Sequence, residues 1–403
     1  MLGLSLRTDA STIKSVPDLL SIFQSSVSFD PNMDFEAFLK QAPAKWAVYL
    51  LADENDQPVQ LLSVKNLRAS LKRRLGGEET IGLTKRVNYR EIVRRIYWRR
   101  VDSGFEADWI YLEAARQLFP RTYQGMVGFK PAWFVHVDPT NNFPRYIKTI
   151  QPLGKRGLVI GPLEDKHAAA RLIHLVEDSF DLCRYYNILV ESPNAKACAY
   201  KEMGKCPAPC DGTISMDEYR RNVQMSSQVL VRPAEFIAEQ DARMQKLAGE
   251  LQFEQAGKVK AKLEQVKQFG KSAFRYAQRI EDFRFVSLQR GPTEGTAKVF
   301  LITPSAVEEV AGLIDEPRGM SDLLKSILQR GEALRSGEMT EAAIERIGLV
   351  AHHLFSGKHP KGVFIRMDEL EEKALEKSWR ELAKQKAPQE AEGEGVLKEL
   401  QAM

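Results

Sequence analysis

In the first third of the chain, the pattern of apolar and polar residues changes from short strand-like runs to the spacing of a helix. Short apolar runs at 46–51 (WAVYLL) and 59–64 (VQLLSV) flank the turn-rich ADENDQP, which predicts a β-hairpin. Apolar positions then recur at helical spacing over 64–75, with Lys and Arg on the opposite edge. A second helix is expected over about 105–119, because Pro120 ends it.

The middle of the chain contains both strand-like runs and helical patterns. Strand-like runs occupy 132–137 and 145–150, and GLVIGP precedes a helical pattern from about 165 to 182. Farther on, two amphipathic stretches are separated by a break near Gln252 and Phe253, which predicts an antiparallel helical hairpin.

The two ends are less regular. Residues 1–40 are expected to form an irregular or weakly helical extension. The strands FRFVSL and AKVFLI flank GPTEGT, the rest from Pro304 is expected to be mostly helical, and the stretch from Ala387 is expected to form a loosely ordered tail. The predicted fold class is α+β multidomain.

Composition places the chain among soluble proteins of roughly two to four domains. Of its 403 residues, 43% are hydrophobic and 28% are charged. The start, MLGLSLRTDAS, lacks the apolar core and cleavage site of a secretory signal. No stretch approaches the ~20 apolar residues of a membrane span. We therefore expect a cytoplasmic protein without a membrane partner.

Positive charge is concentrated between residues 65 and 100. This stretch contains twelve Lys and Arg residues and three Glu residues, so its net charge is +9, whereas the net charge of the whole chain is +4. Such a concentration is typical of a surface that neutralises DNA phosphates. The ordinary alternative is a set of solvated helix faces. The candidate DNA-binding residues are Lys65, Arg68, Lys72, Arg73, Arg94 and Arg95.

All the cysteines of the chain lie within one short window. Cys183, Cys198, Cys206 and Cys210 have the spacing C-x14-C-x7-C-x3-C. Only the last pair is near the spacing of a zinc knuckle. Iron–sulfur clusters tolerate longer gaps and often have a proline beside a ligand, as Pro207 and Pro209 stand here. We favour an iron–sulfur cluster, with zinc as the alternative. The ordinary interpretation is that the four cysteines are small buried hydrophobic residues that bind no metal.

This cysteine segment resembles the central region of the UvrC family of bacterial excinucleases, which act in nucleotide excision repair. The most specific element is C-x-Y-x5-C-x3-C, met by Cys198, Tyr200, Cys206 and Cys210. The resemblance runs from about residue 42 to 275. It implies a [4Fe-4S] cluster held by the four cysteines. It also implies that the hairpin is a UVR motif that binds the damage-loading protein UvrB through Leu251, Phe253, Glu254 and Ala256.

The same resemblance implies a GIY-YIG endonuclease domain before residue 125, and here the sequence departs from the family. Tyr49 and the metal-binding Glu113 persist. Gln60 replaces the second tyrosine, Ser63 a lysine and Ser70 the essential arginine. Phosphodiester hydrolysis needs a base, cations on the developing charge and a Mg²⁺ ion. A core tyrosine at 49 and a surface glutamate paired to Arg116 are the ordinary interpretations.

These observations predict five segments and three possible functions. The segments are an extension (1–40), a degenerate GIY-YIG-like α/β domain (41–125), a cysteine-cluster region (126–225), a UVR-like hairpin (226–275) and a mostly helical segment without the family's second nuclease (276–403). The favoured function is a DNA- and UvrB-binding accessory of excision repair that does not cut. The alternatives are an active Mg²⁺-dependent endonuclease with rearranged residues, and a metal- or redox-responsive interaction protein.

Overall fold

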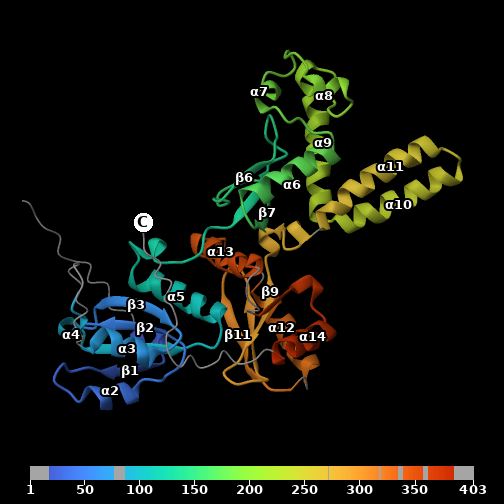
Figure 1. Ribbon diagram of the computed structural model, residues 1–403. Coiled ribbons are helices and arrows are strands. Elements are labelled where there is room, and N and C mark those ends of the chain that lie inside the picture. Colours follow the sequence, from blue (N-terminus) through green and yellow to red (C-terminus); the bar gives the residue numbers. More distant parts are fainter. Residues whose placement is uncertain are drawn as a thin grey trace, which may run out of the picture. The chain divides into compact units, whose positions relative to one another are not determined.

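Three four-stranded antiparallel sheets, each with helices beside it, organise the described part of the chain (Figure 1). The computed structural model describes residues 18–76, 87–270, 272–316, 319–334, 339–356 and 362–384. These residues divide into two units between Gly128 and Phe129, with Arg290–Pro292 grouped with the first unit. The predicted α+β class is confirmed. Among the described helices, none is both long and apolar enough to cross a bilayer.

The first unit is built on a sheet with strand order β1-β4-β2-β3. The predicted hairpin is confirmed, since β2 and β3 pair with Tyr49 opposite Leu62. Its elements are α1 (Leu19–Ile22), β1 (Ser25–Ser28), α2 (Phe35–Gln41), β2 (Ala47–Ala52), β3 (Pro58–Val64), α3 (Leu67–Leu75), α4 (Tyr89–Ile92), β4 (Arg95–Arg100), α5 (Gly104–Leu118) and η1 (Tyr123–Gly125).

Alternation along β2 gives this sheet two separate cores. Tyr49 and Leu51 pack with α2 and α3 on one face. Val48 and Leu50 pack with α5 on the other face. Because successive side chains of a strand point to opposite faces, the element that carries a residue decides which face it can reach.

The described part of the expected irregular or weakly helical extension, residues 18–40, contains the short helix α1 and most of α2, but also the strand β1. Strand β1 pairs with β4 along the edge of the sheet, and Phe38 of α2 is fully buried in the core below it. The sequence of β1 is SSVS, so only Val27 gave an apolar signal. The described part of the expected extension is therefore integral to the first unit. Residues 1–17, and Lys85 and Arg86 of the basic stretch, lie outside the described residues.

The second unit begins with a sheet of order β6-β5-β7-β8 whose core includes α6. Its strands and helices lie close to the predicted runs. They are β5 (Trp133–Val137), β6 (Ile147–Thr149), β7 (Leu158–Leu163), α6 (Lys166–Ser179), α7 (Tyr186–Leu189), α8 (Ala199–Glu202), η2 (Pro209–Asp211) and α9 (Met216–Val231). Helix α9 begins at a capping box in which Ser215 and Glu218 satisfy each other's backbone N–H groups.

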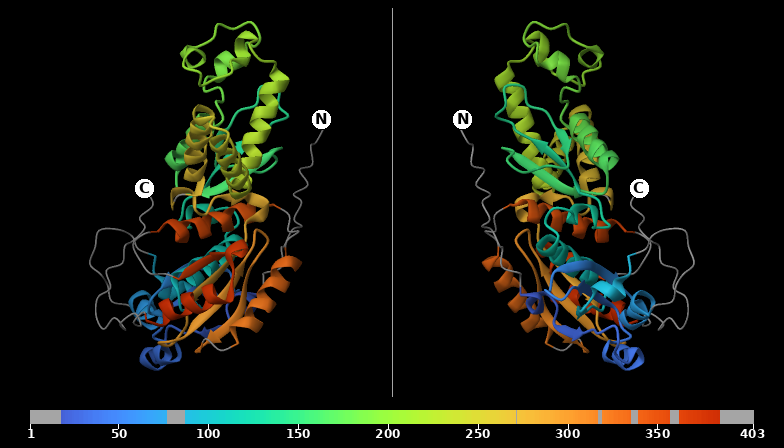
Figure 2. Two further views of the ribbon diagram at one scale, coloured as in Figure 1. Left: turned by 90° about the vertical axis from the view of Figure 1, so that its right-hand side faces the viewer. Right: turned by 90° about the vertical axis from the view of Figure 1, so that its left-hand side faces the viewer.

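The predicted helical hairpin is confirmed as α10 (Pro233–Gly249) and α11 (Phe253–Val266), which lie side by side in Figure 1 and Figure 2. Leu251, expected at the end of the first helix, lies in the turn instead with a φ of 63°. At the base, Phe236 of α10 packs against Phe180 with ring centroids 6.1 Å apart. The chain continues through η3 (Lys267–Gly270), η4 (Ser272–Phe274), β8 (Gln278–Arg279) and η5 (Ile280–Asp282).

In the C-terminal segment the two predicted strands are confirmed as β9 and β10, and the part after Pro304 is mostly helical as expected, but it also contains two strands, β11 and β12, that the sequence did not predict. The segment forms a sheet of order β11-β10-β9-β12 with three helices. The elements are β9 (Phe285–Arg290), β10 (Ala297–Ile302), β11 (Val307–Ile314), α12 (Met320–Ala333), α13 (Glu341–Phe355), β12 (Val363–Arg366), η6 (Met367–Glu369) and α14 (Glu372–Ala383). The expected tail from Ala387 lies outside the described residues.

Candidate functional site

Tyr49, the candidate catalytic base, is sealed inside the first unit. Its side chain is 0% exposed, and its hydroxyl lies 2.8 Å from the Ser70 Oγ on α3. Burial raises the pKa of the Tyr49 phenol, while Ser70 and the nearby Arg74 and Arg73 act in the opposite direction. A neutral phenol bonded to a buried serine cannot meet an attacking water at the surface.

Arg74 is an arginine of α3 that lies near the hydroxyl of Tyr49. It lies four residues after Ser70, one helical turn further along the same edge of α3. Its Nη1 donates to the Gln60 Oε1 at 2.9 Å, and this hydrogen bond joins α3 to β3. Its guanidinium also lies 5.7 Å from the centroid of the Tyr89 ring. Arg74 is thus half-buried and engaged with protein groups.

Glu113 lies on an element that packs against the opposite face of the sheet. It is on α5, whose buried residues join the core of Val48 and Leu50 rather than the core of Tyr49. Its Oε2 accepts from the Arg116 Nη1 at 3.2 Å, one helical turn away. The Tyr49 side chain therefore packs on one face of the sheet, whereas Glu113 comes from the helix that packs on the other face.

The six candidate DNA-binding residues differ in how available they are. Lys65 and Arg73 are exposed and make no ion pair with the described residues. Lys72 is exposed and lies 3.6 Å from the Glu36 carboxylate. Arg68 is half-buried, since its Nε donates to the Ala42 carbonyl at 3.0 Å. Arg94 donates to its neighbouring backbone carbonyl, at Val93.

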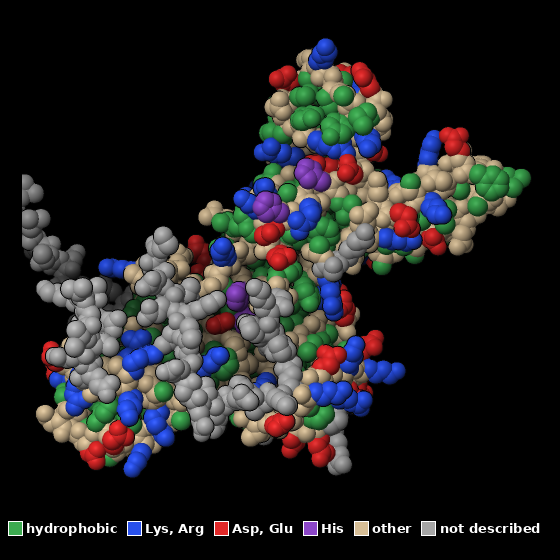
Figure 3. Space-filling view, viewed as in Figure 1, with side chains coloured by type: hydrophobic (Ala, Val, Ile, Leu, Met, Phe, Trp, Pro, Cys, Tyr) green, Lys and Arg blue, Asp and Glu red, His purple; other side chains and the backbone are tan. Residues whose placement is uncertain are grey.

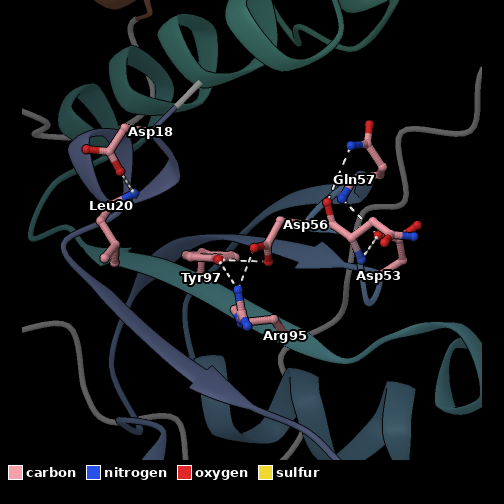
Figure 4. Close-up of polar contacts among 8 residues, drawn as sticks. Asp18, Leu20, Asp53, Asp56, Gln57, Arg95 and Tyr97 are labelled. Atoms are coloured by element: carbon pink, nitrogen blue, oxygen red, sulfur yellow. Dashed lines mark hydrogen bonds and ion pairs between the residues drawn. The ribbon is translucent and has the colours of Figure 1, made fainter. Parts of the chain in front are cut away.

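Arg95 is neutralised within the fold (Figure 4). Its Nη1 lies 2.5 Å from the Asp56 Oδ2 and 3.1 Å from the Tyr97 hydroxyl. The same hydroxyl donates to the Asp56 Oδ1 at 2.8 Å, which closes a three-residue network between β4 and the β2–β3 turn. Exposed Arg100, which lies in the same basic stretch, makes no ion pair with the described residues. The availability of a cation therefore could not be read from charge spacing alone.

The four cysteines lie in one lobe of the second unit, on short helices and loops between α6 and α9. All four are free thiols, with Cys183, Cys206 and Cys210 buried and Cys198 partly exposed. Cys198 caps α8 and Cys210 lies in η2, which starts after a left-handed residue, Ala208, with a φ of 52°. Prolines on both sides of Ala208 restrict this turn. The loop thus presents the last two thiols from a constrained backbone.

Electrostatic interactions connect these thiols to one another. A hydrogen bond between the Cys183 and Cys206 thiols raises the pKa of Cys183 and lowers that of Cys206 to about 7. Burial and the charge of Cys206 raise the pKa of Cys210, with a smaller effect from Cys198. Across the described residues, however, no group of three or more His, Cys, Asp or Glu side chains is arranged to hold a metal ion. The donor types suit a thiolate-bound cluster, and the structure brings Cys183 and Cys206 together without completing the set.

Two further residues organise the surroundings of the thiols. The Tyr219 hydroxyl of α9 accepts from the Cys183 N–H at 3.1 Å. Arg184 lies over the Tyr200 ring at 4.2 Å and donates to the Lys205 carbonyl at 3.2 Å. Sequence reasoning missed both, because Tyr219 stands 36 residues from its partner and Arg184 had only its position beside Cys183 as a signal.

The tip of the hairpin is apolar and exposed, as Figure 3 shows at the free end of α10 and α11. Leu251 is 74% exposed and Phe253 is 65% exposed. Ala256, one turn into α11, is buried, whereas the Glu254 carboxylate pairs at 3.2 Å with Lys258. Of the four candidate partner-binding residues, the structure therefore leaves Leu251, Phe253 and Glu254 accessible and places Ala256 in the packing between helices.

Comparison with known proteins identifies the relatives of this chain. The family model described as the UvrC/Cho excinuclease middle domain matches residues 132–229. UvrABC system protein C of Clostridium novyi is 25% identical over 272 residues, which cover 67% of this chain and 44% of the relative. The protein of the same name from Caldanaerobacter subterraneus is 25% identical over 231 residues, or 57% of this chain and 37% of the relative.

The chain thus spans about two fifths of the length of these curated relatives. No solved structure matches it. The matched middle domain contains β5 to β7, α6, the four cysteines and most of α9, which are the elements described above around the thiols. Residues 132–229 therefore match the UvrC/Cho excinuclease middle domain, and about two thirds of the chain is similar to UvrABC system protein C.

Proposed function

We propose that this protein is a UvrC-like component of nucleotide excision repair that binds DNA and a UvrB-like damage-loading protein but does not cut DNA. The observation that supports the non-cutting part most strongly is the hydrogen bond of 2.8 Å between the buried Tyr49 hydroxyl and Ser70. The residue that the family resemblance assigns to the base is bonded to the residue that replaces the essential arginine. A serine at that position brings no positive charge to a phosphorane.

The chemistry of phosphodiester hydrolysis also supports a protein that does not cut DNA. Removing one group that stabilises a transition state often costs on the order of 10² to 10³ in rate. Gln60, Ser63 and Ser70 stand at three such positions. Losses of this size at three positions leave little catalysis over the uncatalysed reaction.

One observation favours an active endonuclease as the second candidate. Arg74 lies close enough to Tyr49 to favour the phenolate, and it bonds Gln60 at 2.9 Å. A movement of α3 that exposed Tyr49 would bring an arginine with it. In that case cleavage would require Mg²⁺ bound by Glu113, and Glu113→Ala would abolish it.

The DNA-binding part of the proposal rests on the first unit. Lys65, Arg73 and Arg100 are exposed cations without an ion pair among the described residues. Binding through such cations releases counterions, so affinity falls with rising salt. Titrating a duplex with the full chain at several salt concentrations tests this. An affinity that is absent, or that does not change with salt, excludes a phosphate-binding surface.

The partner-binding part rests on the hairpin tip. Two large apolar side chains at 74% and 65% exposure are a typical anchor for a partner helix. The matched test is a pull-down with the C-terminal hairpin of UvrB. Failure of the wild-type chain to retain that hairpin removes the repair partner from the proposal.

For the thiols we propose a [4Fe-4S] cluster held by Cys183, Cys198, Cys206 and Cys210, with zinc as the alternative metal. A cluster would give this lobe thiolate bonds in place of a large hydrophobic core. Anaerobically purified protein is expected to contain about four irons per chain and to absorb broadly in the visible range. Each Cys→Ser variant should lower the iron content, whereas a wild-type chain free of both iron and zinc would favour a metal-independent interaction protein.

A further inference from the structure

An open groove of about 520 Å³ lies in the second unit, between helix α6 and the chain that enters β6. Arg145, Lys148 and His174 line it together with apolar groups, and none of the described residues in its lining is Asp or Glu. Arg145 and Lys148 are exposed and make no ion pair with a described residue, whereas His174 lies 3.3 Å from the Glu177 carboxylate. The groove therefore offers two positive charges to an anion.

Exposed tyrosines continue from this groove onto the lobe that carries the cysteines. The guanidinium of Arg145 lies 3.7 Å from the centroid of the Tyr186 ring, at the start of α7. Its neighbour Tyr185 lies beside Tyr200 of α8, with ring centroids 5.9 Å apart. Figure 3 shows hydrophobic side chains gathered on this lobe, with Lys, Arg and His side chains below them. Arg145, Lys148, Tyr185 and Tyr186 together form what we call the stacking surface.

The exposure of its apolar groups distinguishes this lobe from a packed core. Four of its large hydrophobic side chains are at least 36% exposed, and these are Tyr185, Tyr186, Val190 and Met203. Leaving such side chains in water forgoes the free energy of burial, so a patch of them indicates a binding surface. Because the adjoining groove has cations and no carboxylate in its described lining, a polyanion is favoured as the partner.

A strand of nucleic acid complements both parts of the stacking surface. Its phosphates match the cations, and the faces of its bases match the exposed rings. In a duplex the bases already stack on one another, so the rings favour an unpaired strand. We propose that the stacking surface binds single-stranded DNA, with bases on Tyr185 and Tyr186 and phosphates beside Arg145 and Lys148.

This inference rests on the proposed role in DNA repair and adds a second surface to it. The stacking surface belongs to the second unit, whereas the basic stretch 65–100 belongs to the first unit. Binding of a duplex and binding of a single strand can therefore be measured as separate properties of the same chain.

Fluorescence anisotropy of the full chain with three labelled probes tests the proposal. The probes are a short oligothymidine, a strand of the same length whose sugars carry no bases, and a duplex of the same length. The base-free strand has the same phosphates as oligothymidine, so the difference in affinity between them measures stacking. Oligothymidine is expected to bind about tenfold more tightly than the base-free strand.

Substitutions of the two tyrosines separate stacking from apolar contact. Tyr185→Leu and Tyr186→Leu each keep an apolar side chain but remove the ring, so each should weaken binding of oligothymidine about tenfold. Both should bind the base-free strand and the duplex as the wild type does, which shows that the variants are folded. Tyr186→Phe keeps the ring face and should bind oligothymidine as tightly as the wild type.

A charge substitution tests the groove itself. Lys148→Gln removes an exposed cation, so it should reduce the slope of log affinity for oligothymidine against log salt by about 0.7. Arg330→Gln, an exposed arginine of α12 outside the groove, is the matched control and should leave that slope unchanged.

Three results would overturn the inference. The first is equal affinity for oligothymidine and the base-free strand, since the bases would then not be recognised. The second is wild-type affinity for oligothymidine in both Tyr185→Leu and Tyr186→Leu. The third is no binding of oligothymidine by a chain that binds the duplex in a salt-dependent way, which leaves the proposed function intact. Absence of binding to the duplex as well would contradict the proposed function too.

Discussion

The pair formed by Tyr49 and Ser70 is the contact on which the proposed loss of nuclease activity depends. Tyr49 is 0% exposed and Ser70 is 4% exposed, so the polar atoms of each depend on the other. An arginine at position 70 would need space and solvent for its charge. With serine there, α3 packs over β2, and Tyr49 is part of the core between them.

Breaking the hydrogen bond between Tyr49 and Ser70 should lower the stability of the fold without changing the affinity for DNA. Tyr49→Phe leaves the Ser70 hydroxyl buried without its partner and should reduce the free energy of unfolding by about 1 kcal/mol. Ser70→Ala should cost a similar amount, because the Tyr49 hydroxyl then loses its hydrogen bond to Ser70. The double variant should lose less than the sum of the two, which urea unfolding measures. Additive losses would show that the two hydroxyls do not interact.

The raised pKa of Tyr49 predicts a dependence of stability on alkaline pH. Burial raises the pKa in the folded state, so the neutral phenol is favoured and its contribution is complete below the ordinary pKa of about 10. That contribution is lost as pH rises through the folded-state pKa. The free energy of unfolding should therefore fall less steeply above about pH 10 in Tyr49→Phe than in the wild type. Identical slopes for the two proteins would contradict a buried, hydrogen-bonded phenol.

At the scale of elements, the hydrophobic periodicity of the sequence predicted the regular strands and the long helices. It failed at β11, whose Val307, Val310, Ala311 and Ile314 recur as they would on a helix. The structure pairs this segment with β10, and the register shifts between Ala297 and Phe300, so the alternation is interrupted. A bulge thus produces a helix-like pattern in a strand. At β1, Val27 is the single apolar residue, too weak a signal to predict a strand.

The hairpin allows its tip and its packing to be tested separately. Leu251→Glu changes a side chain that is 74% exposed, so it should leave the melting temperature unchanged and weaken capture of the UvrB hairpin by roughly tenfold or more. Leu263→Ala, at 1% exposure on α11, is the matched control and should cost about 2–5 kcal/mol of stability. Retention of the UvrB hairpin by Leu251→Glu at wild-type strength would exclude the tip as the binding surface.

At the scale of the whole molecule, the sequence located the thiols and the basic stretch but not the state of each side chain. Four cysteines within one window were enough to predict a shared lobe. Whether their sulfur atoms form a complete ligand set depends on loop geometry that spacing does not fix. In the same way, Asp56 lies 39 residues before Arg95 and neutralises it, which no local pattern indicates.

Exposed and neutralised cations should therefore differ in their effect on DNA binding. Arg73→Gln should reduce the slope of log affinity against log salt by about 1, because one fewer counterion is released. Arg95→Gln is the matched control, since its charge is already paired with Asp56 at 2.5 Å, and it should leave the slope nearly unchanged. Fluorescence anisotropy of a labelled duplex measures both. Equal reductions in the two variants would place Arg95 on the DNA-binding surface after all.

Binding without cleavage can be measured in one sample. A labelled, damaged duplex is incubated with the full chain and Mg²⁺, and the bound fraction and the strand lengths are read from the same mixture. We predict a salt-sensitive complex whose DNA strands stay intact. Mg²⁺-dependent shortening of a strand that disappears in Glu113→Ala would contradict a non-cutting role.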